Sequence, residues 1–87
     1  MSVHAHARAD GGPGRAAVVA GRRVGGAVQR NRAKRRLRAV LRAEGLPDGF
    51  DIVVVAKSGA VVAPYPLLLR EYARLRGRIV ERVGVPA

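Results

Sequence analysis

The segment GRRVGGAVQRNRAKRRLRAVLR, residues 21–42, is the most strongly patterned part of the sequence. Nine of its 22 residues are arginine or lysine and none is acidic, so it comes close to accounting for the chain's net charge of +11. At about 100° per residue, its apolar side chains gather on one side of a helix. These are Ala33, Leu37, Val40 and Leu41; the other side carries Asn31, Lys34, Arg35, Arg38 and Arg42, with Arg32 and Arg36 on the flanks.

This pattern predicts a helix that docks its apolar stripe on a core and holds its basic stripe in solvent. We expect it to begin near Gly26 or Ala27 and to end near Glu44–Gly45, because glycine suits a helix C-cap and Pro47 cannot continue a helix. About 17 residues at a rise of ~1.5 Å give roughly 25 Å, enough to cross several phosphates of a folded polynucleotide.

Length and composition set the class of protein. The 87 residues are expected to form a single domain, residues 1–87. An apolar content of 48% argues against disorder, whereas 3% aromatic residues are too few for a sheet that stacks bases. Seventeen basic residues against six acidic ones indicate a polyanionic partner, either nucleic acid or an acidic membrane surface. There is no apolar run long enough to span a bilayer, no hydrophobic signal core and no cysteine, so we expect a cytoplasmic protein.

Three strands are predicted around the basic helix. Alternation in Ser2–Arg8 indicates a half-buried strand. Arg15–Ala20 forms a second strand, short and apolar enough to be central. Phe50–Lys57 is the clearest strand, and its run Ile52–Ala56 indicates burial on both faces.

A second helix is predicted after a loop with two prolines, residues 58–66. It runs from about residue 67 to 82, and its apolar face carries Leu68, Tyr72, Leu75 and Ile79. The order β-β-α-β-α predicts an α+β fold in which a small sheet has helices packed on one face.

No set of side chains predicts catalysis by the chain itself. His4 and His6 would share one face of the first strand, which suggests a metal site, but two solvent-facing histidines explain them more simply because no third ligand accompanies them. Asp48 and Asp51 suggest a weak cation site, although turn formation and strand termination also account for them. No acidic pair has acid/base spacing, so we predict neither catalytic residues nor a protein-only metal site.

Phosphate binding is the chemistry that the basic segment favours. Arginine offers a planar fork of donors that engages two phosphate oxygens at once, and Asn31 could reach a phosphate, a sugar or a base edge. A basic run can also be a solvated helix face. Here no acidic residue is interspersed to form i, i+4 pairs, so self-repulsion costs stability and a binding partner is favoured.

Three segments together resemble the protein component of bacterial ribonuclease P. Residues 30–35, RNRAKR, are similar to the RNR signature of that family. Residues 22–28, RRVGGAV, resemble its basic pair followed by V-G-N-A-V, with Gly26 where many members have asparagine. Residues 46–57, LPDGFDIVVVAK, look like its P-x-G-x-D turn and the strand after it. The resemblance extends nearly end to end from Arg15 to Arg82.

The resemblance implies a fold and a function. The family's basic helix joins two parallel strands by a left-handed crossover, which would make Arg15–Ala20 and Asp51–Ala56 parallel. The family protein binds a catalytic RNA, and together they remove the 5′ leader from precursor tRNA, with hydrolysis carried by the RNA and its Mg²⁺ ions. The chain would be an accessory subunit of this endoribonuclease, with both RNAs as partners and no membrane or small-molecule ligand. By position, the RNA-binding residues would be Arg22, Arg23, Arg30, Asn31, Arg32, Lys34, Arg35 and Arg38.

The N-terminal end departs from the family pattern. Family members normally begin with a further helix that walls one side of a cleft for the single-stranded leader, whereas here Met1 falls within the expected sheet. This fits an N-terminally shortened chain or a misassigned reading frame. The residues expected on the cleft floor are Val3, His4, Ala5 and Ala7.

Two other functions stay open at this point. Another basic module, ribosome-associated or nucleic-acid-compacting, would have no reason to carry the V-G-x-A-V and P-x-G-x-D segments. A membrane-surface helix would need larger apolar anchors than the Ala, Val and Leu of this stripe.

Overall fold

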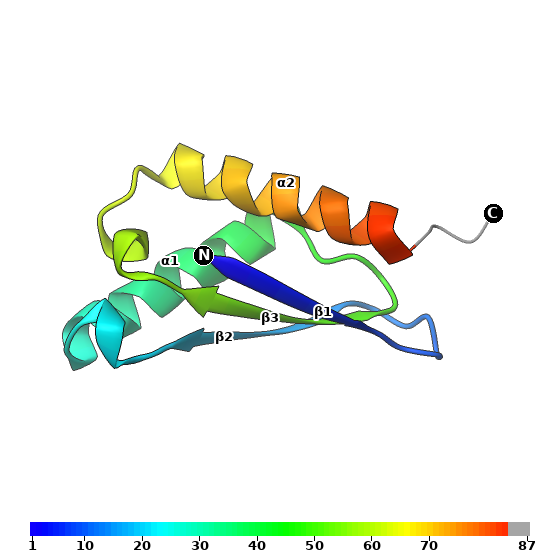
Figure 1. Cartoon of the computed structure of the whole chain (residues 1–87), viewed down its shortest axis with the longest axis horizontal. Helices are drawn as coiled ribbons and strands as arrows, with labels where there is room; N and C mark the ends of the chain where they lie inside the picture. Colours follow the sequence, from blue (N-terminus) through cyan, green and yellow to red (C-terminus); the bar gives the residue numbers. More distant parts are fainter. Residues whose placement is uncertain (84–87) are drawn as a thin grey trace.

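The elements of the chain follow one another in the predicted order (Figure 1). The computed structural model describes residues 1–83, with side chains to residue 80. The strands are β1 (Ser2–Ala7), β2 (Arg15–Ala20) and β3 (Phe50–Ala56), the helices are α1 (Ala27–Glu44) and α2 (Tyr65–Val83), and two 3-10 turns are η1 (Arg22–Val24) and η2 (Ser58–Val61). The basic helix thus begins and ends where the sequence predicted.

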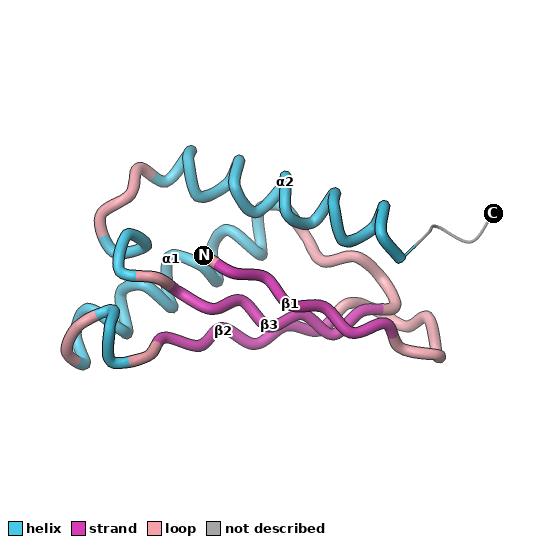
Figure 2. The backbone as a smooth tube through the Cα atoms, viewed as in Figure 1, coloured by secondary structure: helices cyan, strands magenta, loops and turns pink. Residues whose placement is uncertain are grey.

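The three strands form one sheet in the order β1-β3-β2 (Figure 2). β3 pairs antiparallel with β1 and parallel with β2, which confirms the expected parallel pair. The prediction that Arg15–Ala20 is central was wrong, because β3 occupies the centre. β3 carries four consecutive branched residues, Ile52 to Val55, which pack well on a pleated sheet, whereas half of β2 is alanine.

Both helices cover the same face of the sheet. On that face Ile52, Val54 and Ala56 of β3 are buried in one core cluster with side chains of α1 and α2, among them Leu37 and Tyr72. Alternate residues of β3 point the other way, and Val53 is 39% exposed. The prediction of burial on both faces was therefore wrong. In the described part of the chain no helix covers the second face of the sheet, and we call this second face the open face.

Helix α2 begins two residues earlier than predicted, at Tyr65. Pro66 is its second residue, where a missing N–H breaks no intrahelical hydrogen bond. Of the predicted apolar face, Leu68 and Tyr72 are buried, and Leu75 and Ile79 are half-buried. No helix in residues 1–83 is both long enough and apolar enough to cross a bilayer.

The end of α1 is joined to the middle of α2. Gly45 ends α1 at φ 81°, a backbone angle that favours glycine, and its N–H donates to the carbonyl oxygen of Leu41 at 2.8 Å. The hydroxyl of buried Tyr72 donates to the carbonyl oxygen of Gly45 at 2.9 Å, and Arg76 donates to the carbonyl oxygen of Glu44. The predicted C-cap is confirmed, and it also serves as an acceptor that positions α2.

Candidate nucleic-acid interface

Helix α1 presents most of the predicted RNA-binding residues to solvent. Its buried residues Ala33, Leu37 and Val40 fix the rotation of the helix on the core. The exposed predicted residues are Arg22 and Arg23 on η1, and Asn31, Arg32, Arg35 and Arg38 on α1; Arg30 and Lys34 are half-buried at the flank. The sheet and α2 therefore hold one face of α1 while the other stays free for a ligand.

These eight side chains are not engaged by the protein itself. Among the described residues none of them forms a hydrogen bond or an ion pair, and the carboxylates that form ion pairs have other partners. Asp51 binds Arg8 and Arg15, and Glu71 binds the N-terminal amine. The donors of these eight side chains are thus available to an external anion, and the repulsion between their charges is not offset by these carboxylates.

The approach to α1 explains the glycines of the V-G-x-A-V segment. Gly25 has φ 135°, and a Cβ there would lie 2.9 Å from Cβ of Gln29, so this position requires glycine. Gly26 is the N-cap of α1 at an ordinary φ of −72° and makes no side-chain cap hydrogen bond. Because glycine at an N-cap costs only a few tenths of a kcal/mol relative to asparagine, Gly26 is tolerated at this position.

The positive end of the α1 dipole lies beside further cations. Arg22, Arg23 and Lys57 line a cleft of about 520 Å³ between η1 and the end of β3. Because β2 and β3 run parallel, the residues that follow both strands meet at one edge of the sheet. Lys57 was not among the predicted RNA-binding residues, and only the strand pairing could have placed it beside Arg22 and Arg23. The helix dipole adds to the positive potential here.

Arg36 has a structural task that separates it from its neighbours on α1. Its Nη1 donates to the carbonyl oxygens of Ala60 and Val61, each at 2.9 Å, and its Nη2 donates to that of Ala63. These bonds hold η2 and the loop that follows it against α1. Sequence position alone placed Arg36 on the helix flank and could not identify its acceptors.

The predicted cleft-floor residues do not share one face. Val3, Ala5 and Ala7 are register partners of Val54, Ile52 and Phe50, so they lie on the helix-covered side of the sheet, although Ala5 and Ala7 are exposed. His4 alone lies on the open face, opposite Val53, with His6 opposite Asp51 two residues further on. The alternation of a strand divides the predicted set.

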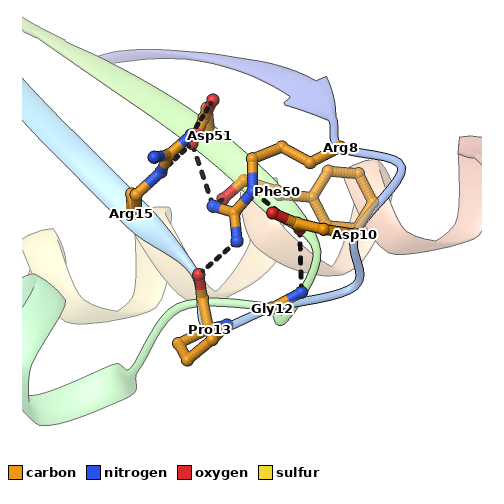
Figure 3. A network of polar contacts seen from close by, with 7 residues as sticks. All are labelled: Arg8, Asp10, Gly12, Pro13, Arg15, Phe50 and Asp51. Carbon is orange, nitrogen blue, oxygen red and sulfur yellow. Dashed lines mark hydrogen bonds and ion pairs between the residues drawn. The ribbon is translucent and has the colours of Figure 1, made fainter.

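One end of the open face is closed by a cluster of charges (Figure 3). Arg15 contacts the carboxylate of Asp51 through Nε at 2.8 Å and Nη2 at 3.0 Å, and Arg8 Nη1 adds a bond at 3.0 Å. Hydrogen bonds from Arg15 and Arg8 lower the pKa of Asp51 to about 2. Asp51 is therefore an ion-pair partner, and no group of three or more His, Asp or Glu in the described residues is arranged to hold a metal ion.

Comparison with known proteins now identifies the family. The family model described as Ribonuclease P matches residues 1–80. The chain belongs to the ribonuclease P protein family. A ribonuclease P protein component from Symbiobacterium thermophilum is 40% identical over 86 residues, which cover 94% of this chain and 75% of that protein. Its counterpart from Dehalococcoides mccartyi is 42% identical over 64 residues, covering 74% of this chain and 53% of that protein.

Solved structures of ribonuclease P proteins confirm the fold. The protein from Thermotoga maritima superimposes with a TM-score of 0.73 at 26% identity, covering 87% of this chain and 74% of that one. The protein from Staphylococcus aureus has a TM-score of 0.70 at 20% identity, a likeness of fold, covering 90% and 72%. The α+β fold and the ribonuclease P protein family predicted from the sequence are thus confirmed.

Proposed function

We propose that this chain is the RNA-binding subunit of a cytoplasmic ribonuclease P, which binds the catalytic RNA through α1 and assists removal of the 5′ leader from precursor tRNA. The observation that carries the proposal is the 18-residue helix α1, whose exposed basic side chains have no partner among the described residues, in a chain of this family. The same array would suit a generic nucleic-acid module, but the family match favours ribonuclease P.

In this proposal the side chains of α1 recognise folded RNA through its phosphates. Arg30, Arg32, Arg35 and Arg38 supply planar forks for phosphate oxygens, Lys34 supplies a point charge, and Asn31 bonds a phosphate, sugar or base edge. Arg22 and Arg23 extend the array beyond the start of the helix. Because the core fixes the rotation of α1, the backbone positions from which these side chains project are fixed.

Hydrolysis in this proposal belongs to the catalytic RNA and its Mg²⁺ ions. In the described part of the chain the carboxylate of Asp51 is already paired with two guanidiniums. The protein's contribution is positive charge. Cations placed against the RNA backbone reduce phosphate repulsion, so less free Mg²⁺ is needed to hold the two RNAs together.

We place the leader on the open face of the sheet. His4 is the predicted floor residue on this side, and exposed Val53 and Val19 form the surface beside it. Val3, Ala5 and Ala7 have no part in this proposal. Replacing His4 with alanine should weaken binding of precursor tRNA but not of mature tRNA. Equal weakening of both would contradict the proposal that the leader binds on this face.

The deciding experiment is precursor-tRNA cleavage by the cognate RNA at low Mg²⁺, with and without the chain. We expect stimulation that disappears in the Arg30→Ala/Arg32→Ala double variant while helical circular dichroism is unchanged. The Arg70→Ala/Arg74→Ala double variant is a matched control, because it removes the same charge from the exposed face of α2. No binding of the catalytic RNA would overturn the proposal, and binding without stimulation would overturn the leader-processing part.

A further inference from the structure

A basic groove with one aromatic wall lies on the side of α1 that faces the start of α2. Its volume is about 400 Å³, and it is lined by Arg32, Arg35, Arg36, Ala39, Arg42 and Tyr65. We propose that this arginine–tyrosine groove binds an unpaired nucleotide of RNA, with its base stacked on Tyr65 and its phosphates held by the arginines. The inference rests on the proposed function and adds Arg42 and Tyr65 to the RNA-binding surface.

The helix spacing gives the groove its shape. Arg32, Arg35, Ala39 and Arg42 follow one another at steps of three or four residues and so form one stripe. Ten residues at ~1.5 Å span about 15 Å, more than the spacing of neighbouring phosphates along a strand. Ala39 supplies almost no side chain in the middle of this stripe, which leaves a hollow between long arginines.

Arg36 is the fixed wall of the groove. Its guanidinium is held by the carbonyl oxygens of Ala60, Val61 and Ala63. An arginine has five N–H donors, so two of them have no acceptor among the described residues. A ligand oxygen therefore meets a guanidinium that is already positioned, and little side-chain entropy is lost on binding.

Tyr65 is the aromatic residue that lines the groove. It is half-buried at the first turn of α2, where it packs against the core and also lines the groove. Tyr72, the other tyrosine, is 0% exposed. Stacking suits a ring held on one side by the core, because every base has a face to offer and the ring has few rotamers to lose.

The combination of charges and ring selects the class of ligand. Four arginines with no acidic residue in the lining select a polyanion. A ring among them adds a contact that inorganic anions cannot use but nucleobases can. Single-stranded RNA has both features, and the same chemistry is available in an unpaired segment of the catalytic RNA or of precursor tRNA.

Tyrosine fluorescence is the direct test, because the chain has two tyrosines and no tryptophan. A short single-stranded oligoribonucleotide should quench the Tyr65 signal, whereas inorganic polyphosphate should compete for binding without equal quenching. Equal quenching by polyphosphate would show that the groove reads charge alone, and an acidic peptide that quenches more strongly than the oligonucleotide would assign a protein partner. Either result overturns the inference.

Variants separate stacking from folding. Tyr65→Ala should weaken oligonucleotide binding about tenfold, and Tyr65→Phe should restore it because the ring is kept. Arg42→Ala, on an exposed residue outside the core, should reduce the log–log salt slope by about one unit, whereas Arg74→Ala on the far face of α2 should leave the slope unchanged. Unchanged binding in both Tyr65→Ala and Arg42→Ala contradicts the groove.

The same variants distinguish failure of the groove from failure of the proposed function. Titration of the catalytic RNA gives the second readout. Suppose that Arg42→Ala and Tyr65→Ala bind that RNA with normal affinity, and that neither the oligonucleotide nor the precursor tRNA quenches the Tyr65 fluorescence of the unmodified chain. These results together would reject the groove and leave the proposed function of α1 intact. Loss of catalytic-RNA binding by the unmodified chain would reject the function itself.

Discussion

Arg15 and Asp51 are register partners on parallel strands, and their side chains form a two-point ion pair at 2.8 and 3.0 Å. Arg8, whose side chain is 10% exposed, bonds the same carboxylate and also reaches the carbonyl oxygen of Pro13 at 2.7 Å. One carboxylate therefore ties together β2, β3 and the loop between β1 and β2. The turn before β3 is set by this loop as well, since Gly49 exchanges backbone hydrogen bonds with Arg8 and Gly12.

Asp51 should make the stability of the fold sensitive to acid. Its pKa is lowered to about 2 in the folded chain, below the value in an unfolded one, so the contribution of the ion pair is complete above about pH 4 and is lost as pH falls toward 2. Urea denaturation midpoints should fall over this range, and Asp51→Asn should flatten the fall. Asp48→Asn, on an exposed residue, is the control and should keep the wild-type profile.

Tyr72→Phe should destabilise the chain by about 1 kcal/mol, because the change leaves the carbonyl oxygen of Gly45 without its 2.9 Å donor at the junction of the two helices. Tyr65→Phe also removes a tyrosine hydroxyl, but that hydroxyl forms no such bond among the described residues. Its effect on the free energy of unfolding should therefore be near zero. Urea melts at pH 7 measure both. Equal effects would mean that the Tyr72 hydroxyl adds nothing specific.

Gly14 and Gly77 should respond in opposite directions to alanine. A Cβ on Gly14 would lie 2.6 Å from Cβ of Leu46 and 2.7 Å from the carbonyl oxygen of Pro47, so Gly14→Ala should destabilise by about 1–3 kcal/mol through steric overlap. Gly77 lies in α2, and a methyl group added there would meet nothing within 4 Å beyond its own helix, so Gly77→Ala should stabilise by up to about 1 kcal/mol. Thermal unfolding measures both variants, and a shift of both melting temperatures in the same direction would refute this account.

Arg35 and Arg36 are neighbours in sequence with different tasks. Arg36→Ala should lower the free energy of unfolding by about 1–3 kcal/mol, because three carbonyl oxygens of η2 and the following loop lose their donor. Arg35→Ala should leave stability within about 0.5 kcal/mol and weaken RNA binding instead. Denaturation therefore separates the two variants, and an equal loss of stability in both would contradict the structural role of Arg36.

RNA affinity should fall steeply with salt. Binding led by counterion release gives a linear plot of log K against log salt concentration, and several phosphate contacts imply a slope of several units. A fluorescence titration of the catalytic RNA between low and moderate salt measures it. A slope near zero would exclude a phosphate-binding array on α1.

The elements that the sequence predicted well are those whose pattern is local. The period of apolar residues in α1, with Gly45 after it, is complete within the segment, so the bounds of the helix followed directly. The place of β2 in the sheet depends on which strand pairs on both sides, and that choice emerges only when its three alanines are compared with the branched run Ile52–Val55 of β3. Pro66 was placed in the loop because proline breaks helix interiors, although it is tolerated in a first turn.

The binding surface divides in the same way. Exposure of Arg32, Arg35 and Arg38 follows from the helix period, and it was predicted. Lys57 lies beside Arg22 and Arg23 because β2 and β3 are parallel. Tyr65 lies beside the arginines of α1 because α2 packs against α1. The set expected on the cleft floor was divided by strand alternation, which the sequence itself contains in Ser2–Ala7.

Helix α1 is the covalent bridge between β2 and β3, whose paired residues lie 36 positions apart in the chain, as in Arg15 and Asp51. Pairing of β2 with β3 closes a long loop that contains α1, so the placement of the cationic face is coupled to that pairing. An RNA that binds this face but not the unfolded chain must then shift the folding equilibrium by mass action. Under the proposed function, the stability of the folded chain therefore rises with the concentration of the RNA that it binds.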